Sequence, residues 1–128
     1  MNWNLLGLVM AGGALGAAGR YLIGGWLLRQ AGHGILWGTL PINLLGSLAA
    51  GFLFAWLGNR GPSALYWRAF LIVGILGGFT TYSGLMLECL LYTRVGRTGP
   101  LFGYLAITLF GGFALVWFGA RLGDFLRN

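Results

Sequence analysis

The chain has 128 residues, of which 58% are hydrophobic and only 8% are charged. Water-soluble domains carry roughly 25% charged residues, so this composition argues against a soluble enzyme and favours an integral membrane protein. The formal net charge of +6 comes from eight arginines that are scattered along the chain, and the absence of a basic run argues against nucleic-acid binding.

Four apolar stretches follow one another along the sequence. They cover residues 5–28, 35–57, 69–92 and 100–121, and polar or glycine-containing loops separate them. Each stretch is long enough to cross a hydrocarbon core of about 30 Å as a helix. We therefore expect an all-α membrane protein in which residues 1–128 form one domain of four transmembrane helices, with Pro41 kinking the second of them.

The arginines define the orientation of the chain only weakly. One side of the membrane would receive four of them and the other side three: Arg60, Arg68, Arg121 and Arg127 against Arg29, Arg94 and Arg97. Arginines near short loops set the orientation of membrane proteins, and a difference of one hardly specifies either. Two hypotheses stay open: insertion in both orientations with assembly of an antiparallel dimer, or one orientation that other features determine.

Glycine is unusually frequent, with 25 residues in the chain. Small residues four positions apart let two membrane helices approach closely. This spacing occurs in Gly12 with Gly16, Gly46 with Ala50, Ser47 with Gly51, and Gly74 with Gly78. We expect these pairs to form helix contacts within and between subunits of an oligomer.

Polar side chains inside the apolar stretches are the candidates for function, because a polar group in hydrocarbon must find a partner or line water. They are Arg20, Thr39, Asn43, Thr80, Thr81, Tyr82, Ser83, Glu88 and Thr108. Several also have a purely structural interpretation. Asn43 and Arg20 could each anchor one helix to another, and Glu88 could pair with an arginine.

The middle of the third stretch, residues 74–84, contains four glycines together with Thr80, Thr81 and Ser83. These residues compete for backbone hydrogen bonds and favour a broken helix, whose freed carbonyl groups can hold a cation. The alternative is a glycine-rich packing face on an unbroken helix.

Motifs typical of catalysis are missing from the sequence. It has no cluster of metal-ligating residues, no nucleophile with a base, and no phosphate-binding loop, and His33 stands alone in a loop. We therefore expect a protein that is not an enzyme. Hydrogen-bond donors outnumber acids inside the spans, which favours passage or binding of a small anion.

Three groups of residues, one in each of the first three spans, form a specific set. They are Gly16-Ala17-Ala18-Gly19-Arg20-Tyr21, Gly38-Thr39-Leu40 with Asn43 and Gly46, and Gly77-Gly78-Phe79-Thr80-Thr81-Tyr82-Ser83 with Glu88. With the length and the span pattern, this set resembles the small bacterial fluoride channels often called Fluc or CrcB.

The resemblance implies a multi-pass protein of the prokaryotic plasma membrane that exports toxic fluoride by passive flow. It implies an antiparallel, dual-topology homodimer with two fluoride pathways and a broken third helix. A structural sodium ion would be held by the backbone carbonyls of Gly77 and Thr80. The implied pore residues are Asn43, Tyr82, Ser83, Leu85 and Thr108, and Arg20, Thr39, Thr81 and Glu88 would have vestibule or structural roles.

Two positions depart from the family pattern. Leu85 replaces the second of two phenylalanines, and Gly84 stands where threonine is usual. Leucine lacks the positive ring edge with which an aromatic side chain contacts an anion. A second hypothesis of function is a proton-coupled exporter like the small multidrug transporters, for which Glu88 is the candidate carboxylate.

Overall fold

The structure is a computed structural model that describes residues 1–32 and 37–128. His33 and the first two residues of the expected second span, 35 and 36, lie outside the described residues. Throughout the described ranges every regular element is a helix, which confirms the all-α expectation.

The first helix, α1 (Trp3–Ala31), has a defined boundary at each end. At its start the Asn2 side chain accepts hydrogen bonds from the backbone N–H groups of Asn4 and Leu5, at 3.0 and 3.3 Å. These bonds satisfy donors that have no partner within the helix. The helix stops at Gly32, whose φ of 80° is readily adopted only by glycine.

The second helix, α2 (Leu40–Trp56), begins later than expected and has 17 residues. Pro41 therefore lies in its first turn. The expectation that Pro41 kinks the second span was wrong, because proline in the first turn removes no intrahelical hydrogen bond.

The next helical stretch consists of four segments. The helix α3 (Ser63–Trp67) continues into the π-helical segment η2 (Arg68–Leu76) and the short α4 (Gly77–Phe79). Two residues with extended backbone dihedrals follow, Thr80 (φ −82°, ψ 156°) and Thr81 (φ −148°, ψ 120°), and then α5 (Tyr82–Arg94). The last stretch comprises α6 (Thr98–Ala106), the π-helical η3 (Ile107–Gly111) and α7 (Gly112–Arg127).

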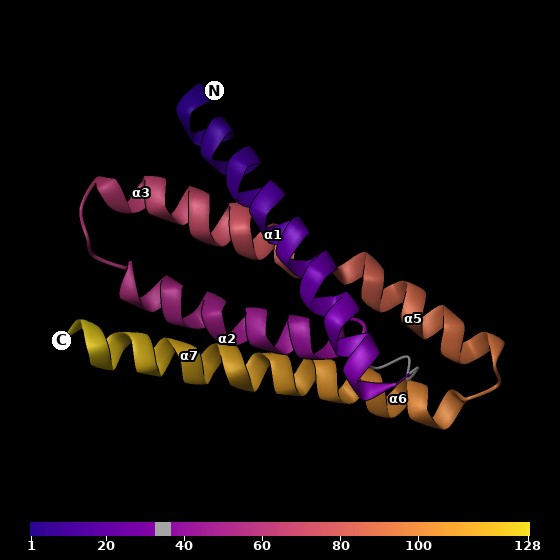
Figure 1. The fold of residues 1–128 in the computed structure, drawn as a ribbon. Coiled ribbons are helices and arrows are strands. Elements are labelled where there is room, and N and C mark those ends of the chain that lie inside the picture. Colours follow the sequence, from indigo (N-terminus) through magenta and orange to yellow (C-terminus); the bar gives the residue numbers. More distant parts are fainter. Residues whose placement is uncertain (33–36) are drawn as a thin grey trace.

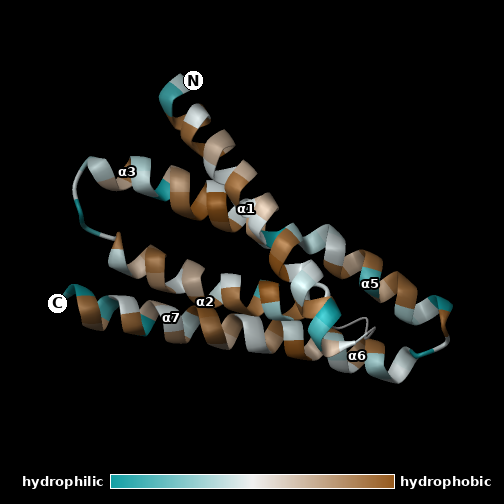
Figure 2. Cartoon of the chain, viewed as in Figure 1, coloured by the Kyte–Doolittle hydropathy of each residue, from teal (hydrophilic) through white to brown (hydrophobic). Residues whose placement is uncertain are grey.

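Three of these stretches are long and apolar enough to cross a membrane, namely Trp3–Ala31, Ser63–Arg94 and Thr98–Arg127. The helix α2 is apolar but shorter, and its 17 residues rise by about 26 Å. Hydrophilic residues gather at the two termini and at the α2–α3 and α5–α6 connections (Figure 2).

Two helix contacts organise the chain: α2 lies along α7, and α1 crosses the η2–α4 stretch (Figure 1). Glycines make both contacts close. A Cβ atom on Gly12 would lie 2.9 Å from the Cα of Gly74, and one on Gly119 would overlap the Leu48 carbonyl. Gly12 contacts Gly74, Gly16 lies against Ile75 and Phe79, and Gly78 lies against Gly13 and Ala17. These close approaches agree with the expected role of both glycine pairs in helix contacts within the chain.

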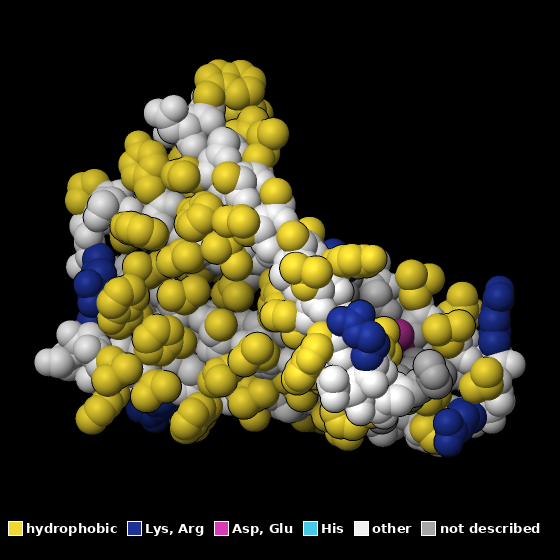
Figure 3. All heavy atoms as spheres, in the orientation of Figure 1, with side chains coloured by type: hydrophobic (Ala, Val, Ile, Leu, Met, Phe, Trp, Pro, Cys, Tyr) yellow, Lys and Arg dark blue, Asp and Glu magenta, His cyan; other side chains and the backbone are white. Residues whose placement is uncertain are grey.

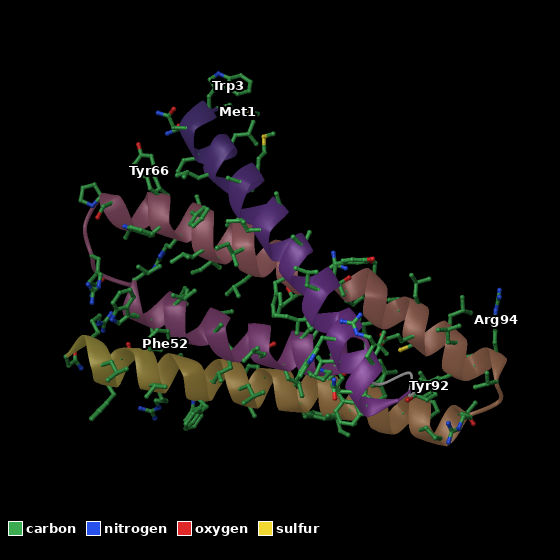
Figure 4. The ribbon with its side chains drawn as sticks, viewed as in Figure 1. Met1, Trp3, Phe52, Tyr66, Tyr92 and Arg94 are labelled. Atoms are coloured by element: carbon green, nitrogen blue, oxygen red, sulfur yellow. The ribbon has the colours of Figure 1, made fainter. Side chains whose placement is uncertain are left out.

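The surface is strongly apolar (Figure 3). Phe110, Phe113 and Phe125 are exposed over 77%, 74% and 77% of their surface. A surface of this kind suits a lipid environment rather than water. The buried cluster is small and joins α5 to α6 through Leu85, Tyr92 and Tyr104. Tyr92 lies at the end of the α5–α6 pair (Figure 4), with its ring centroid 5.8 Å from that of Tyr104.

Candidate functional site

A cavity of about 420 Å³ lies where α2, the Thr80–Thr81 connection and the η3–α7 stretch meet. It brings together most of the residues that the sequence singled out: Asn43, Tyr82, Leu85 and Thr108 of the expected pore, Gly77 and Thr80 of the expected cation site, and Thr81. Ser83, Arg20, Thr39 and Glu88 are not part of its lining. The remaining lining residues are Gly46, Ser47, Ala50, Ile72, Leu76, Leu109 and Val116.

The amide side chain of Asn43 binds the extended backbone at Thr81. Its Nδ2 donates to the Thr81 carbonyl oxygen at 3.1 Å, and its Oδ1 accepts from the Thr81 N–H at 2.8 Å. A primary amide has a second N–H, which has no hydrogen-bond partner in the part of the chain that the structure describes. Asn43 therefore supplies a fixed donor at the wall of the cavity.

Arg20 binds the same segment from another helix. Its Nε donates to the carbonyl oxygen of Gly78 at 3.1 Å. Hydrogen bonds from a charged group are stronger than neutral ones, so Arg20 ties α1 to the residues directly before the extended pair. This contact agrees with the structural role considered for Arg20, that of an interhelical anchor.

Three hydroxyl groups of the cavity lining donate to their own helices. Ser47, Thr80 and Thr108 each donate to the carbonyl oxygen four residues earlier, that of Asn43, Leu76 and Tyr104, at 2.7, 2.8 and 2.9 Å. Such bonds compete weakly with the helical backbone, so rotation about χ1 can redirect each hydroxyl. These three hydroxyl groups can therefore turn to donate hydrogen bonds to an anion in the cavity.

Two backbone carbonyls near the extended pair lack their helical donors. In a continuous α-helix the Thr81 N–H would donate to the Gly77 carbonyl, but here it donates to Asn43. The Thr80 carbonyl accepts no hydrogen bond from any described residue. Both residues contribute to the lining of the cavity.

Glu88 belongs to a polar cluster outside the cavity. Its Oε2 accepts from the Thr39 hydroxyl at 2.5 Å and from the Tyr104 hydroxyl. The oxygens of these two hydroxyls lie 2.7 Å apart. The idea that Glu88 pairs with an arginine was wrong for the described residues, where the one ion pair joins Arg127 to Asp124 at 3.3 Å.

Tyr104 was missed by sequence reasoning. It is only 1% exposed, and Thr108, which was singled out, follows it by one turn on the same helix. The available signal was its hydroxyl group, since a buried tyrosine O–H normally finds a hydrogen-bond partner. The hydroxyl group of Tyr104 is easily overlooked in an apolar span, because tyrosine is also counted as a hydrophobic residue.

Long apolar helices around a cavity that contains a few polar side chains define a multi-pass helical membrane protein. The chain belongs to the CrcB family: residues 7–120 match the family described as CrcB-like protein, Camphor Resistance (CrcB). The family resemblance noted in the sequence is thereby confirmed.

Curated relatives cover nearly the whole chain. A protein of Xanthomonas euvesicatoria pv. vesicatoria (strain 85-10), named fluoride-specific ion channel FluC, is 52% identical over 124 residues, which are 97% of this chain and 93% of that protein. The protein of that name in Xylella fastidiosa (strain 9a5c) is 51% identical over 97% of this chain and 87% of its own. The one in Caulobacter vibrioides (strain NA1000 / CB15N) is 41% identical, with coverages of 91% and 92%.

Proposed function

We propose that this protein is a passive fluoride-selective channel of the prokaryotic plasma membrane, which relieves the cell of toxic fluoride. The relatives that cover nearly the full chain carry the name fluoride-specific ion channel. The observation that carries the proposal from the structure is the Asn43 amide at the cavity wall, which is anchored to Thr81 and has one N–H with no partner among the described residues.

Fluoride needs such donors because a small ion loses much hydration energy when it leaves water. A Born estimate for transfer of an ion into an apolar medium is on the order of tens of kcal/mol. Hydrogen bonds from the Asn43 amide and from the hydroxyls of Ser47 and Thr108 replace part of the lost water. The ring edge of Tyr82, which carries partial positive charge, adds a further contact. A narrow path that closes these donors around fluoride holds a larger halide less well.

The path is completed by a second copy of the chain in the opposite orientation. The cavity of the single chain is open along one side, and the seven arginines near the loops are divided four to three between the two sides. An antiparallel homodimer closes the open side and contains two equivalent pathways. In this arrangement α2 also crosses the membrane, which brings the number of spans to four. The stretch from Ser63 to Arg94 is one span that is broken at Thr80 and Thr81.

A structural sodium ion fits the carbonyl groups of the broken span. Thr80 offers an acceptor without a donor, and the Gly77 carbonyl has lost its helical N–H partner to Asn43. Carbonyl oxygens are suitable ligands for a hard cation. A dimer supplies the carbonyl oxygens of Gly77 and Thr80 twice. A sodium ion bound to them places a fixed positive charge near the ion path, which offsets the repulsion that a permeating anion meets from nearby negative groups.

The positions that depart from the family pattern have clear structural environments. Leu85 is 4% exposed and packs in the cluster of Tyr92 and Tyr104. A Cβ atom on Gly84 would lie 2.7 Å from Cγ2 of Thr81 and 3.1 Å from Cγ2 of Thr39. Leu85 and Gly84 are therefore both closely packed against neighbouring side chains.

The test is fluoride efflux from proteoliposomes, followed with a fluoride electrode, in parallel with chloride efflux from a second batch. We expect fluoride efflux far above that of protein-free vesicles and little chloride efflux. Fluoride efflux no faster than from empty vesicles, or equal rates for the two halides, would contradict the proposal.

Glu88 distinguishes this channel from a proton-coupled exporter. It is the only acid within the four spans expected from the sequence, residues 5–28, 35–57, 69–92 and 100–121, so Glu88→Gln must abolish coupled transport if the protein is an exporter. For a channel we expect Glu88→Gln to leave fluoride efflux largely unchanged, because glutamine keeps an oxygen that accepts from Thr39 and Tyr104. Asp124→Asn, at the exposed partner of Arg127, is the control. Loss of transport in Glu88→Gln alone, together with uphill fluoride movement driven by a proton gradient, would establish the exporter.

A further inference from the structure

A second cavity, of about 500 Å³, lies between the end of α2 and the start of the α3–η2 stretch. Its lining consists of Trp56, Leu57, Arg60, Ser63, Trp67 and Leu71. None of these residues lines the cavity at Asn43, so this second cavity, the Arg60 cavity, is separate from the proposed ion path and independent of it.

The guanidinium group of Arg60 makes two contacts with Trp56. Its Nε donates to the Trp56 carbonyl oxygen at 3.1 Å, and its central carbon lies 4.0 Å from the centroid of the Trp56 ring. Both contacts leave the two terminal nitrogens without a partner among the described residues. A planar pair of N–H donors of this kind suits two oxygens of a phosphate group.

The chain cannot neutralise Arg60 with its own acids. It contains only two acidic residues against eight arginines. Asp124 pairs with Arg127, and Glu88 is occupied by Thr39 and Tyr104. Arg68, eight residues further along the chain, has a buried Nε with no hydrogen-bond partner among the described residues, and its guanidinium group lies 5.5 Å from the centroid of the Phe54 ring. The anion that balances this end of the molecule must therefore come from outside the chain.

The surroundings of Arg60 identify this end as a membrane interface. Tryptophans and arginines concentrate where the hydrocarbon core meets the headgroups, and the cavity has Trp56 and Trp67 in its lining. Arginine side chains appear beside hydrophobic ones at the end that carries the α2–α3 connection (Figure 3). Trp67, which is 54% exposed, and Leu71 add apolar surface to the lining of the same cavity.

From this combination we propose that the Arg60 cavity binds one anionic phospholipid. The phosphate group contacts the terminal nitrogens of Arg60, and an acyl chain lies along Trp67 and Leu71. A free phosphate ion satisfies only the first of these contacts, and a neutral or zwitterionic lipid lacks the net charge that Arg60 and Arg68 leave unbalanced.

Native mass spectrometry of the full-length protein in detergent tests the proposal, with phosphatidylglycerol and phosphatidylcholine added at equal concentrations. We expect selective retention of phosphatidylglycerol, and about fivefold weaker retention in Arg60→Gln, the factor that corresponds to about 1 kcal/mol per arginine at an anionic surface. Trp67→Ala, which leaves Arg60 intact, removes part of the acyl-chain wall and is expected to weaken retention as well.

Arg121→Gln is the matched control. Arg121 stacks on Trp117, four residues earlier, at 5.0 Å, as Arg60 stacks on Trp56, but it is not in the lining of the Arg60 cavity. Equal losses of lipid in Arg60→Gln and Arg121→Gln would overturn the proposal, as would equal retention of the two lipids. Displacement of the lipid by inorganic phosphate at the same concentration would show a free-anion site instead. If Arg60→Gln changed the monomer–dimer ratio but not lipid retention, a second copy of the chain would be the occupant, and the proposal would be wrong.

Discussion

Two neighbouring regions of the molecule are stabilised in different ways. Where α1 crosses the η2–α4 stretch, Gly12, Gly16, Gly74 and Gly78 bring backbone against backbone. A few residues later, at the Thr80–Thr81 connection, the Asn43 side chain hydrogen-bonds the backbone directly. The first region is packed mainly through backbone atoms, and the second depends on a side chain of another helix.

The difference shows how a thin bundle can be firmly packed and still present polar groups. Close contact of glycine backbones gains van der Waals energy without any buried polar side chain. The break in the helix instead leaves backbone groups that need partners in hydrocarbon. Asn43 binds Thr81 of the extended pair, and Arg20 binds the Gly78 carbonyl just before it. Consequently the crossing region should be sensitive to added volume, and the connection should be sensitive to a change of polarity.

The largest effect on the stability of the fold is expected from Gly16→Ala. A Cβ atom at this position would overlap the Ile75 carbonyl and lie 2.8 Å from the Phe79 nitrogen, and backbone cannot move aside as a side chain can. Overpacking of this kind costs about 3 kcal/mol, which equilibrium unfolding in mixed micelles can measure. Gly7→Ala is the control, because nothing lies within 4 Å of its added Cβ. If both variants were equally stable, the close crossing of α1 over η2–α4 would be disproved.

The next effect is expected from Asn43→Asp in the fluoride efflux assay. The substitution keeps an acceptor for the Thr81 N–H but removes the donor to the Thr81 carbonyl, and it places a negative charge at the cavity wall. Repulsion of about 3 to 4 kcal/mol at the effective dielectric of proteins should lower fluoride efflux by about a hundredfold or more.

The control for this variant is Asn59→Asp in the exposed α2–α3 connection, for which we expect normal efflux. Dimer content of both variants is checked by size-exclusion chromatography. Unchanged efflux in a folded Asn43→Asp protein would remove Asn43 from the pathway and leave it as a helix anchor.

The smallest effect is expected from Leu85→Phe. Leu85 is almost fully buried yet also lines the cavity, so the larger ring can extend into open space and the cost should stay below about 1 kcal/mol, less than usual for overpacking. Restoring a second aromatic ring should maintain or raise fluoride efflux. Leu87→Phe, at a residue that is 63% exposed, controls for added bulk. An inactive but folded Leu85→Phe protein would indicate that the path is packed around leucine.

The apolar runs of the sequence were sufficient to predict an all-helical membrane protein, because hydrophobic length is a local property of the chain. The ends of the helices were predicted less well. The helix α2 begins at Leu40, after the turn residues Gly38 and Thr39 that were expected to lie inside the second span, since Pro41 is better placed in a first turn than inside a helix. The spacing of Gly12, Gly16, Gly74 and Gly78 indicated two helix faces but not that they would face each other.

Only the tertiary structure decided where the polar groups find their partners. Residues 74–84 marked a segment in which glycine and hydroxyl residues compete with the helix, but the extended dihedrals occur at Thr80 and Thr81, where Asn43 reaches the backbone from 38 residues away in the chain. Likewise the contact of Tyr104 with Thr39 and Glu88 joins three helical segments. The hydropathy of a stretch depends only on its own residues. The hydrogen-bond partner of a buried donor depends on which helices pack side by side.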